Sequence, residues 1–435
     1  MSPVTRRRML RALLVATLLA PGMLNAAGTD DRFRFDAGAA AYLGAWDEVL
    51  TEETQLDVGL TSGPWSGALQ IPLRFHLASF SGGGEARFRD EDWDSAGDVL
   101  RVLQHVSFDD PDLGLMVRAG SLADLTLGRG EIVAGLSDDL NLDRPETGLH
   151  VRWRHPVAEV EAFATSLLTP PVLGTRVMGR PLAPVGGVLG RLELDATWAG
   201  DTRAPVSITP GASGGVSRGT DTVNVYGGGV ALPLPSERVT AVPYATVAGL
   251  DSEGGGVHVG AGAVVRPDKR FEFGLGAEYR YTWGAYAPGY FTAAYALERD
   301  RFTTGVPKLA ALVGGQVGEG HGFEVRVRAD AKDVWSAELR FADRQGPCNT
   351  DGAVRLSASL PHGITASGLL LHQGADGVAD MFRLERALAA AQITVPLVGP
   401  LALEGFYARA LLGPQSTLPT LFHRGMLGLS VAGTW

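Results

Sequence analysis

Cysteine and lysine are nearly missing from this sequence of 435 residues, which holds one cysteine, Cys348, and three lysines. A single thiol excludes an intrachain disulfide, and the polar surroundings of Cys348 indicate an incidental loop thiol and not a nucleophile. Beyond residue 27 there is no stretch of about 18 or more apolar residues, so no helix is expected to span a membrane. The sequence is therefore typical neither of a disulfide scaffold nor of a helical membrane protein.

Motifs with known chemistry are also scarce. The sequence has no HExxH helix and no paired-cysteine metal site, and its nine histidines are scattered. His150 falls beside two arginines on a polar strand face, where a wall residue is the simpler interpretation. The glycine runs Gly227–Gly229 and Gly254–Gly256 lack the lysine of a phosphate-binding loop, so we interpret them as strand and loop glycines. We expect no enzyme activity, no cofactor and no metal.

The sequence has fewer basic residues than acidic ones, 38 against 48. The formal net charge is −10, and removal of a leader that carries four arginines and no acids would change it to −14. Nucleic acid needs a basic surface on its protein partner, so it is excluded as a partner.

What the sequence does have is alternation. In the stretch Phe271–Trp283 every odd position is apolar, while the even positions are Glu, Gly, Arg or Thr. Successive side chains of a strand point to opposite faces, so this pattern predicts a strand with one apolar and one polar face. The same pattern recurs at 32–46, 191–198, 323–330 and 335–341.

The connections between these strands suggest a barrel. Short turn-like links alternate with longer polar or glycine-rich stretches, as in transmembrane barrels with short periplasmic turns and longer external loops. Counting strands in this way predicts roughly 22 strands, or about 18 to 20 if the weakly supported strands are left out. The weak members are residues 56–60, 175–181 and 309–317.

The final eleven residues, Gly425–Trp435, form a strand with Leu427, Leu429, Val431 and Trp435 on its apolar face. This ending resembles the C-terminal signature of Gram-negative outer-membrane β-barrel proteins, in which the closing strand ends in an aromatic residue. The commonest family ending is Phe, and here it is Trp. The resemblance implies an all-β fold, a single closed antiparallel transmembrane barrel of about 18–22 strands in the outer membrane. Its implied partners are outer-membrane lipid and the barrel-assembly machinery.

The N-terminal stretch is typical of an export signal. Four arginines at positions 6, 7, 8 and 11 precede the apolar run Leu13–Ala20, and Ala26 and Ala27 follow. This layout predicts a cleaved signal peptide at 1–27 and one barrel domain at 28–435. The arginines also resemble a twin-arginine signal, but that route carries folded proteins. A strand predicted from Phe33 leaves no room for a plug domain ahead of the barrel.

Charged residues on the predicted inner faces are the candidate selectivity residues of a water-filled lumen. They could equally satisfy one another as structural ladders in the wall. The candidates are Arg118, Arg152, Arg154, Arg191, Glu193, Asp195, Glu272, Glu278, Arg280, Glu324, Arg326, Arg328, Glu338 and Arg340.

One long connection, Ser121–Thr147, is the best candidate for a loop that folds into the lumen. It combines charged residues with leucines, isoleucine and valine that could anchor it to the wall. An external loop, or part of the wall, is the alternative.

A barrel with this many strands encloses a lumen unless loops fill it. The sequence therefore predicts a passive, porin-like channel for small polar solutes or ions. A structural or surface-interaction barrel with a closed lumen is the alternative, and an outer-membrane hydrolase is a weaker third.

Overall fold

The computed structural model describes residues 33–46, 49–79, 86–137, 146–168, 171–210, 216–251, 253–300, 306–315, 319–346, 349–375, 377–382, 387–412 and 420–434. The predicted signal peptide, Cys348 and Trp435 lie outside these ranges, so the leader remains a prediction. No helix among the described residues is long and apolar enough to cross a membrane.

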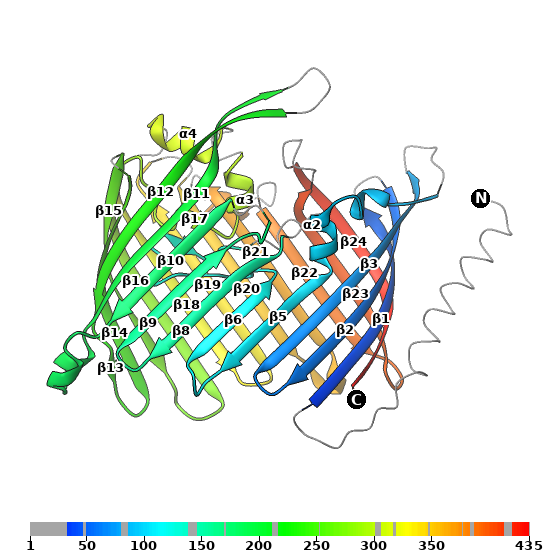
Figure 1. The fold of residues 1–435 in the computed structure, drawn as a ribbon, viewed down its shortest axis with the longest axis horizontal. Helices are drawn as coiled ribbons and strands as arrows, with labels where there is room; N and C mark the ends of the chain where they lie inside the picture. The colour runs from blue at the N-terminus through cyan, green and yellow to red at the C-terminus, as the bar shows by residue number, and fades with distance from the viewer. Residues whose placement is uncertain are drawn as a thin grey trace.

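Twenty antiparallel strands form one closed wall (Figure 1). They are β1 Phe33–Trp46, β2 Val49–Ser62, β3 Trp65–Ser79, β5 Leu103–Asp110, β6 Leu115–Gly120, β8 Gly148–His155, β9 Ala158–Ala164, β10 Val172–Gly179, β11 Glu193–Pro210, β12 Val216–Ala231, β14 Val239–Leu250, β15 Gly254–Val265, β16 Phe271–Gly284, β18 Gly320–Ala331, β19 Trp335–Arg344, β20 Thr350–Ser359, β21 Thr365–Ala375, β22 Ala387–Pro396, β23 Leu401–Leu412 and β24 Thr420–Thr434.

Shorter strands and helices lie outside the twenty strands of this wall. Two-residue strands β4 (Arg87–Phe88) and β13 (Leu234–Pro235) pair with its rims. The remaining pieces are β7 Val133–Ala134, β17 Phe291–Thr292, α2 Ala96–Arg101, α3 Tyr295–Glu298, α4 Lys308–Val313, η2 Asp90–Asp92, η3 Ala183–Val185, η4 Leu189–Arg191, η5 Pro361–Gly363 and η6 Asp380–Phe382.

The wall closes between its first and last strands. β1 pairs with β24 from Asp36↔Thr434 to Trp46↔Arg424, and with β2 on its other side. Closure leaves no strand edge of the wall without a partner, which a membrane-spanning sheet requires because hydrocarbon cannot bond the backbone. The predicted single closed antiparallel barrel is confirmed.

The wall is apolar outside and polar inside. Along β16 the outward Leu275 is 58% exposed, whereas the inward Glu278 is only 7% exposed. The two faces alternate throughout this strand, with its odd positions exposed and its even positions partly or fully buried. The predicted orientation of the alternation is therefore confirmed: the apolar face meets the surroundings of the barrel and the charged face meets its interior.

The rims also differ as predicted. The short links near 111–114, 156–157, 266–270, 332–334 and 397–400 all join strands at one rim. Most of the longer connections lie at the other rim, where Figure 1 shows α2, α3 and α4. The exception is 180–192, which carries η3 and η4 at the rim of the short links. In outer-membrane barrels the rim with short turns is periplasmic.

Two sequence predictions about elements need correction, while two of the predicted weak strands are found as strands. In the predicted strand 309–317 the described residues do not form a strand, because α4 occupies Lys308–Val313. The apolar residues there recur at helical spacing, with Leu309 and Leu312 both buried. The wall has 20 strands, against roughly 22 predicted with all weak strands included and about 18 to 20 without them. One of the longer glycine-rich connections predicted from the sequence, 200–220, is mostly strand, because β11 continues to Pro210 and β12 begins at Val216. Residues 56–60 lie within β2, and 175–179 within β10.

Candidate functional site: the lumen and its internal plug

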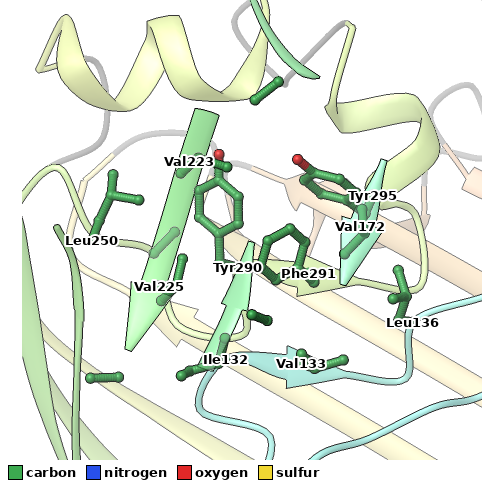
Figure 2. Close-up of a cluster of buried hydrophobic side chains, with 14 of the residues drawn as sticks. Ile132, Val133, Leu136, Val172, Val223, Val225, Leu250, Tyr290, Phe291 and Tyr295 are labelled. Carbon is green, nitrogen blue, oxygen red and sulfur yellow. The ribbon is translucent and has the colours of Figure 1, made fainter. Parts of the chain in front are cut away.

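Two connections at the long-loop rim fold into the barrel and pair with each other. β7 from the segment 121–137 and β17 from the segment 285–300 form a parallel pair, Phe291↔Val133 and Thr292↔Ala134. We call these two segments together the plug. Their apolar side chains, including Ile132 and Tyr290, are fully buried in one cluster (Figure 2).

The plug packs on the inner faces of β9 to β12 and β14. The wall residues in its hydrophobic cluster include Phe163, Val172, Val223, Val225 and Leu250, several of which surround Tyr290 and Phe291 in Figure 2. The predicted inward path of the 121–147 connection therefore holds for residues 121–137, while 138–145 lie outside the described residues. The partner segment 285–300 was not predicted, because nothing in its sequence distinguishes an inward from an outward loop.

Glycines in the wall make room for the plug. A Cβ added at Gly256 on β15 would lie 2.7 Å from Cε1 of Tyr286, and one added at Gly227 on β12 would lie 3.0 Å from Cδ1 of Ile132. Both glycines belong to the runs that we interpreted as strand glycines. Their function here is to admit plug side chains close to the wall.

A buried cluster of charges lies on the inner faces of β16, β18 and β19. Arg280 Nη2 lies 2.7 Å from Glu324 Oε2, and Arg340 Nη2 lies 2.8 Å from the same oxygen. Arg326 contacts Glu324, and Arg280 also contacts Glu278. The sequence predicted all five residues for the inner face, and the structure brings them together in one network.

Three residues that the sequence analysis did not select extend this network. His258 on β15 is fully buried, with Nδ1 3.0 Å from Glu278 Oε1 and Nε2 3.2 Å from the hydroxyl of Tyr286. The Tyr244 hydroxyl donates to Glu278 at 2.8 Å. His258 and Tyr244 occupy polar positions of alternating strands, which was the signal that could have found them.

A second ladder of charges runs across β9, β10 and β11. Arg176 lies between Glu159 at 3.2 Å and Asp195 at 3.1 Å. Glu193 lies 2.8 Å from Arg180 and 3.4 Å from Arg129 of the plug. Glu193 and Asp195 were predicted for the inner face and take part in this ladder.

A third cluster joins strands from opposite ends of the sequence. Arg424 on β24 contacts Glu53 on β2, which also accepts a hydrogen bond of 3.0 Å from Arg74 on β3. Arg74 in turn lies 3.5 Å from Asp92. This cluster was not predicted, because only the register of distant strands brings these side chains together.

The remaining candidates are dispersed. Arg152 stands opposite Glu161 in the β8–β9 register, but Glu161 bonds His150 at 2.7 Å. Arg154 pairs with Glu159 at 3.1 Å. Arg118 is exposed, and no ion pair is seen for it within the described part of the chain.

Two further candidates lie near the short-turn rim. Glu272 is paired with Arg266 at 2.8 Å, with 35% of the Glu272 side chain and 55% of the Arg266 side chain exposed. Arg191 is misplaced by the sequence prediction, because it belongs to the exposed turn η4 before β11 begins at Glu193. A strand cannot start earlier there, since residues 183–191 form two short helical turns.

Two candidates lie on β18 and β19, toward the same rim. Arg328 lies 3.6 Å from Asp330 and keeps 58% of its side chain exposed. Glu338 is half-buried and faces Arg328 across the β18–β19 register. The role of any candidate in solute selectivity remains a prediction.

The closing strand presents its apolar residues outward. Leu427 and Leu429 are exposed on the outer face, and Val431 is half-buried on the same face. Trp435 lies outside the described residues. The pairing of β24 with β1 agrees with the predicted closure, whereas a role of these residues in assembly remains a prediction.

The plug carries one acid in an unusual environment. Glu131 is 1% exposed, and its Oε2 accepts a 3.1 Å hydrogen bond from the backbone of Arg129. Burial raises the pKa of the Glu131 carboxyl, the charge of nearby Asp195 raises it further, and Arg176 opposes both. No group of three His, Cys, Asp or Glu side chains among the described residues is placed to hold a metal ion.

The closed wall, the apolar outer face and the charged inner face together define a transmembrane β-barrel of the outer-membrane class. No protein-family model matches the chain, and no curated protein sequence matches it.

Solved outer-membrane barrels of Gram-negative bacteria have a similar architecture. Pseudomonas aeruginosa OpdL is 9% identical, with a TM-score of 0.32 over 93% of this chain and 99% of that one. Pseudomonas aeruginosa OccK2 (OpdF), solved with glucuronate, is 11% identical, with a TM-score of 0.35 over 93% and 98%. Escherichia coli Wzi, a carbohydrate-binding barrel involved in group 1 capsule assembly, is 10% identical, with a TM-score of 0.36 over 92% and 84%. At these identities the likeness concerns architecture and assigns no activity.

Proposed function

We propose that the protein is a passive outer-membrane channel for small polar solutes or ions. The observation that carries this proposal is that polar side chains on the inner face remain exposed. Arg118, Ser357, Ser367 and Gln392 all point to the interior, and all are exposed. Barrels of about eight strands fill their interior with side chains, whereas those of roughly 16 or more enclose water.

A hollow on the inner face supports the same proposal. A cavity of about 360 Å³ lies toward the short-turn rim, across the adjacent strands β18 to β22. Its lining includes Asp330, Ser336, Ser357, Ser367 and Gln392. Cavities of this size suit small molecules, and hydroxyl, amide and carboxylate groups hydrogen-bond polar ones.

Transport would be diffusion, biased by the charges that solutes meet on the way. Exposed lumenal arginines such as Arg118 and Arg328 attract anions, while exposed acids attract cations. The buried pairs around Glu324 serve mainly to stabilise the wall, since their charges are already compensated. Outer-membrane lipid and the assembly machinery are the expected macromolecular partners, and the proposal assigns no catalytic role.

Purified protein in a planar lipid bilayer tests the proposal. We expect stepwise conductance, and Arg328→Glu should shift ion preference toward cations. Arg191→Glu is the matched control, because Arg191 lies in a turn outside the strand and should leave ion preference nearly unchanged. Arg326 is a poor choice for this test, since it holds both Glu324 and the backbone carbonyl of Arg129.

The plug favours one alternative, a structural or surface-interaction barrel with a closed lumen. Its buried cluster joins the inner faces of five neighbouring strands. Folded protein that stays silent at several salt concentrations and voltages would support this alternative and refute the channel. Cleavage of lipid or peptide substrates by such silent protein would favour a hydrolase instead.

A further inference from the structure

One hydrogen-bonded chain connects the wall to both segments of the plug. Glu278 on β16 bonds His258 on β15, and His258 bonds the hydroxyl of Tyr286 in the segment 285–300. That hydroxyl donates to the backbone carbonyl of Glu131 in the segment 121–137 at 2.8 Å. His258 is thus the wall residue through which this chain reaches the plug.

The chain fixes where its protons lie. Tyr286 has one hydroxyl proton, which it gives to the carbonyl of Glu131, so it must accept from Nε2 of His258. Glu278 accepts from Arg280 and Tyr244, as a carboxylate does, so Nδ1 of His258 must donate to it. Both ring nitrogens therefore carry protons, and the chain is complete only when His258 is an imidazolium.

The Glu131 side chain lies at the same junction and also depends on a proton. Its Oε1 is buried without a hydrogen-bond partner in the part of the chain that the structure describes. A buried carboxyl without a full set of donors is more stable when neutral. The pKa of Glu131 is raised chiefly by burial, so its ionised form is less favourable in the seated plug than in water.

Two other carboxylates at this junction are paired with arginines, and Tyr286 is neutral. Glu278 is paired with Arg280, and on the far side of Glu131 the carboxylate of Asp195 is paired with Arg176. Burial raises the pKa of Tyr286 well above its ordinary value, so it stays neutral. A third arginine, Arg344, also acts on Tyr286 through its charge.

The two segments behave as one body because their backbones are bonded to each other. The amide of Gly289 donates to the carbonyl of Glu131 at 2.8 Å, and that of Phe291 donates to the carbonyl of Ile132 at 2.9 Å. Loss of the His258 contact or ionisation of Glu131 therefore acts on the whole plug.

We propose that protonation controls the seating of the plug: it is held against the wall in acid and released as the pH rises, which widens the channel. Both groups act with the same sign. Because the pKa of Glu131 is raised in the seated state, that state is stabilised at pH values below the ordinary pKa of a carboxyl group. This stabilisation is lost as the pH rises through the raised pKa. Loss of a proton from the His258 imidazolium breaks the hydrogen-bonded chain, so it acts in the same direction as ionisation of Glu131. The inference concerns regulation of the proposed channel and rests on it only for the change in conductance.

Thiol labelling measures seating without requiring conductance. In a Cys348→Ser background, Ala134→Cys places a thiol in β7, where Ala134 is 2% exposed. Ser367→Cys, on the exposed inner face, is the matched control for the pH dependence of thiol reactivity. The rate of labelling by a charged maleimide is measured for both at about pH 5 and at about pH 8.

The Ala134→Cys rate divided by the Ser367→Cys rate should rise with pH, by up to about tenfold per pH unit for each proton released. Glu131→Gln should make this rise less steep, and His258→Phe should leave Ala134→Cys labelled quickly even in acid. Gel mobility with and without heating shows whether each variant forms a closed barrel.

A ratio that stays constant between the two pH values, or protection in acid that survives His258→Phe in a folded barrel, would overturn the inference. Conductance distinguishes its failure from that of the channel. A pH-dependent ratio in a barrel that never conducts would refute the channel and leave the control of seating in place.

Discussion

Replacing Glu324 with glutamine should destabilise the barrel by about 3–5 kcal/mol, because it removes one partner from buried ion pairs. The Glu324 side chain is 2% exposed and contacts the guanidinium groups of Arg280, Arg326 and Arg340. Glutamine keeps the shape of the side chain but not its charge. Arg280, with only 4% of its side chain exposed, would then keep Glu278 as its one carboxylate partner among the described residues.

The free energy of unfolding of both proteins is measured by tryptophan fluorescence in a denaturant series with lipid vesicles. Glu272→Gln is the matched control, since Glu272 pairs with Arg266 at the rim where both are exposed, and it should cost about 0–1 kcal/mol. Adding Arg340→Gln to Glu324→Gln should recover part of the loss by removing an uncompensated charge. Equal costs for Glu324→Gln and Glu272→Gln would refute the reasoning that burial makes this network important.

Other predictions concern the plug seat and the outer face. Gly256→Val should displace Tyr286 and raise the mean conductance in a bilayer. Gly262→Val, whose added Cβ has no neighbour closer than 4.0 Å, should leave the conductance unchanged. Unchanged conductance in Gly256→Val would contradict the role of Gly256 in seating the plug. Leu429→Arg should cost about 2–4 kcal/mol of folding free energy because it places a charge on the lipid face. Ser430→Arg, beside Glu404 on the inner face, should cost clearly less in the same denaturant series.

Much of the fold could be predicted from sequence, because alternation is a local property. Phe271 to Trp283 shows its two faces without any knowledge of neighbouring strands, and the structure has the apolar one outside. The short links indicated the rim on which they lie. The run from Leu309 to Val313 was misread as a strand, because a short apolar run fits a strand as well as a buried helix and only the packing of α4 distinguishes them.

The site was harder to predict than the wall. Alternation shows that Glu324 and Arg340 point inward, but only the β18–β19 register places their charges together. The contact between Glu53 and Arg424 joins residues 371 positions apart. The position of Tyr286 depends on a loop whose path no periodicity records, so the link from His258 to the plug could not be foreseen.

The cluster of Arg424, Glu53 and Arg74 has a consequence for how the wall is completed. Arg424 is on β24, while its partner Glu53 is on β2 and also pairs with Arg74 on β3, so the attraction passes over β1 and bridges the seam. This contact cannot form until the last strand, β24, joins the sheet. The buried ion pair then forms together with the last set of backbone hydrogen bonds between strands. The joint between first and last strands is thus reinforced on its inner side, and forcing it apart would uncover charge as well as unpaired peptide groups.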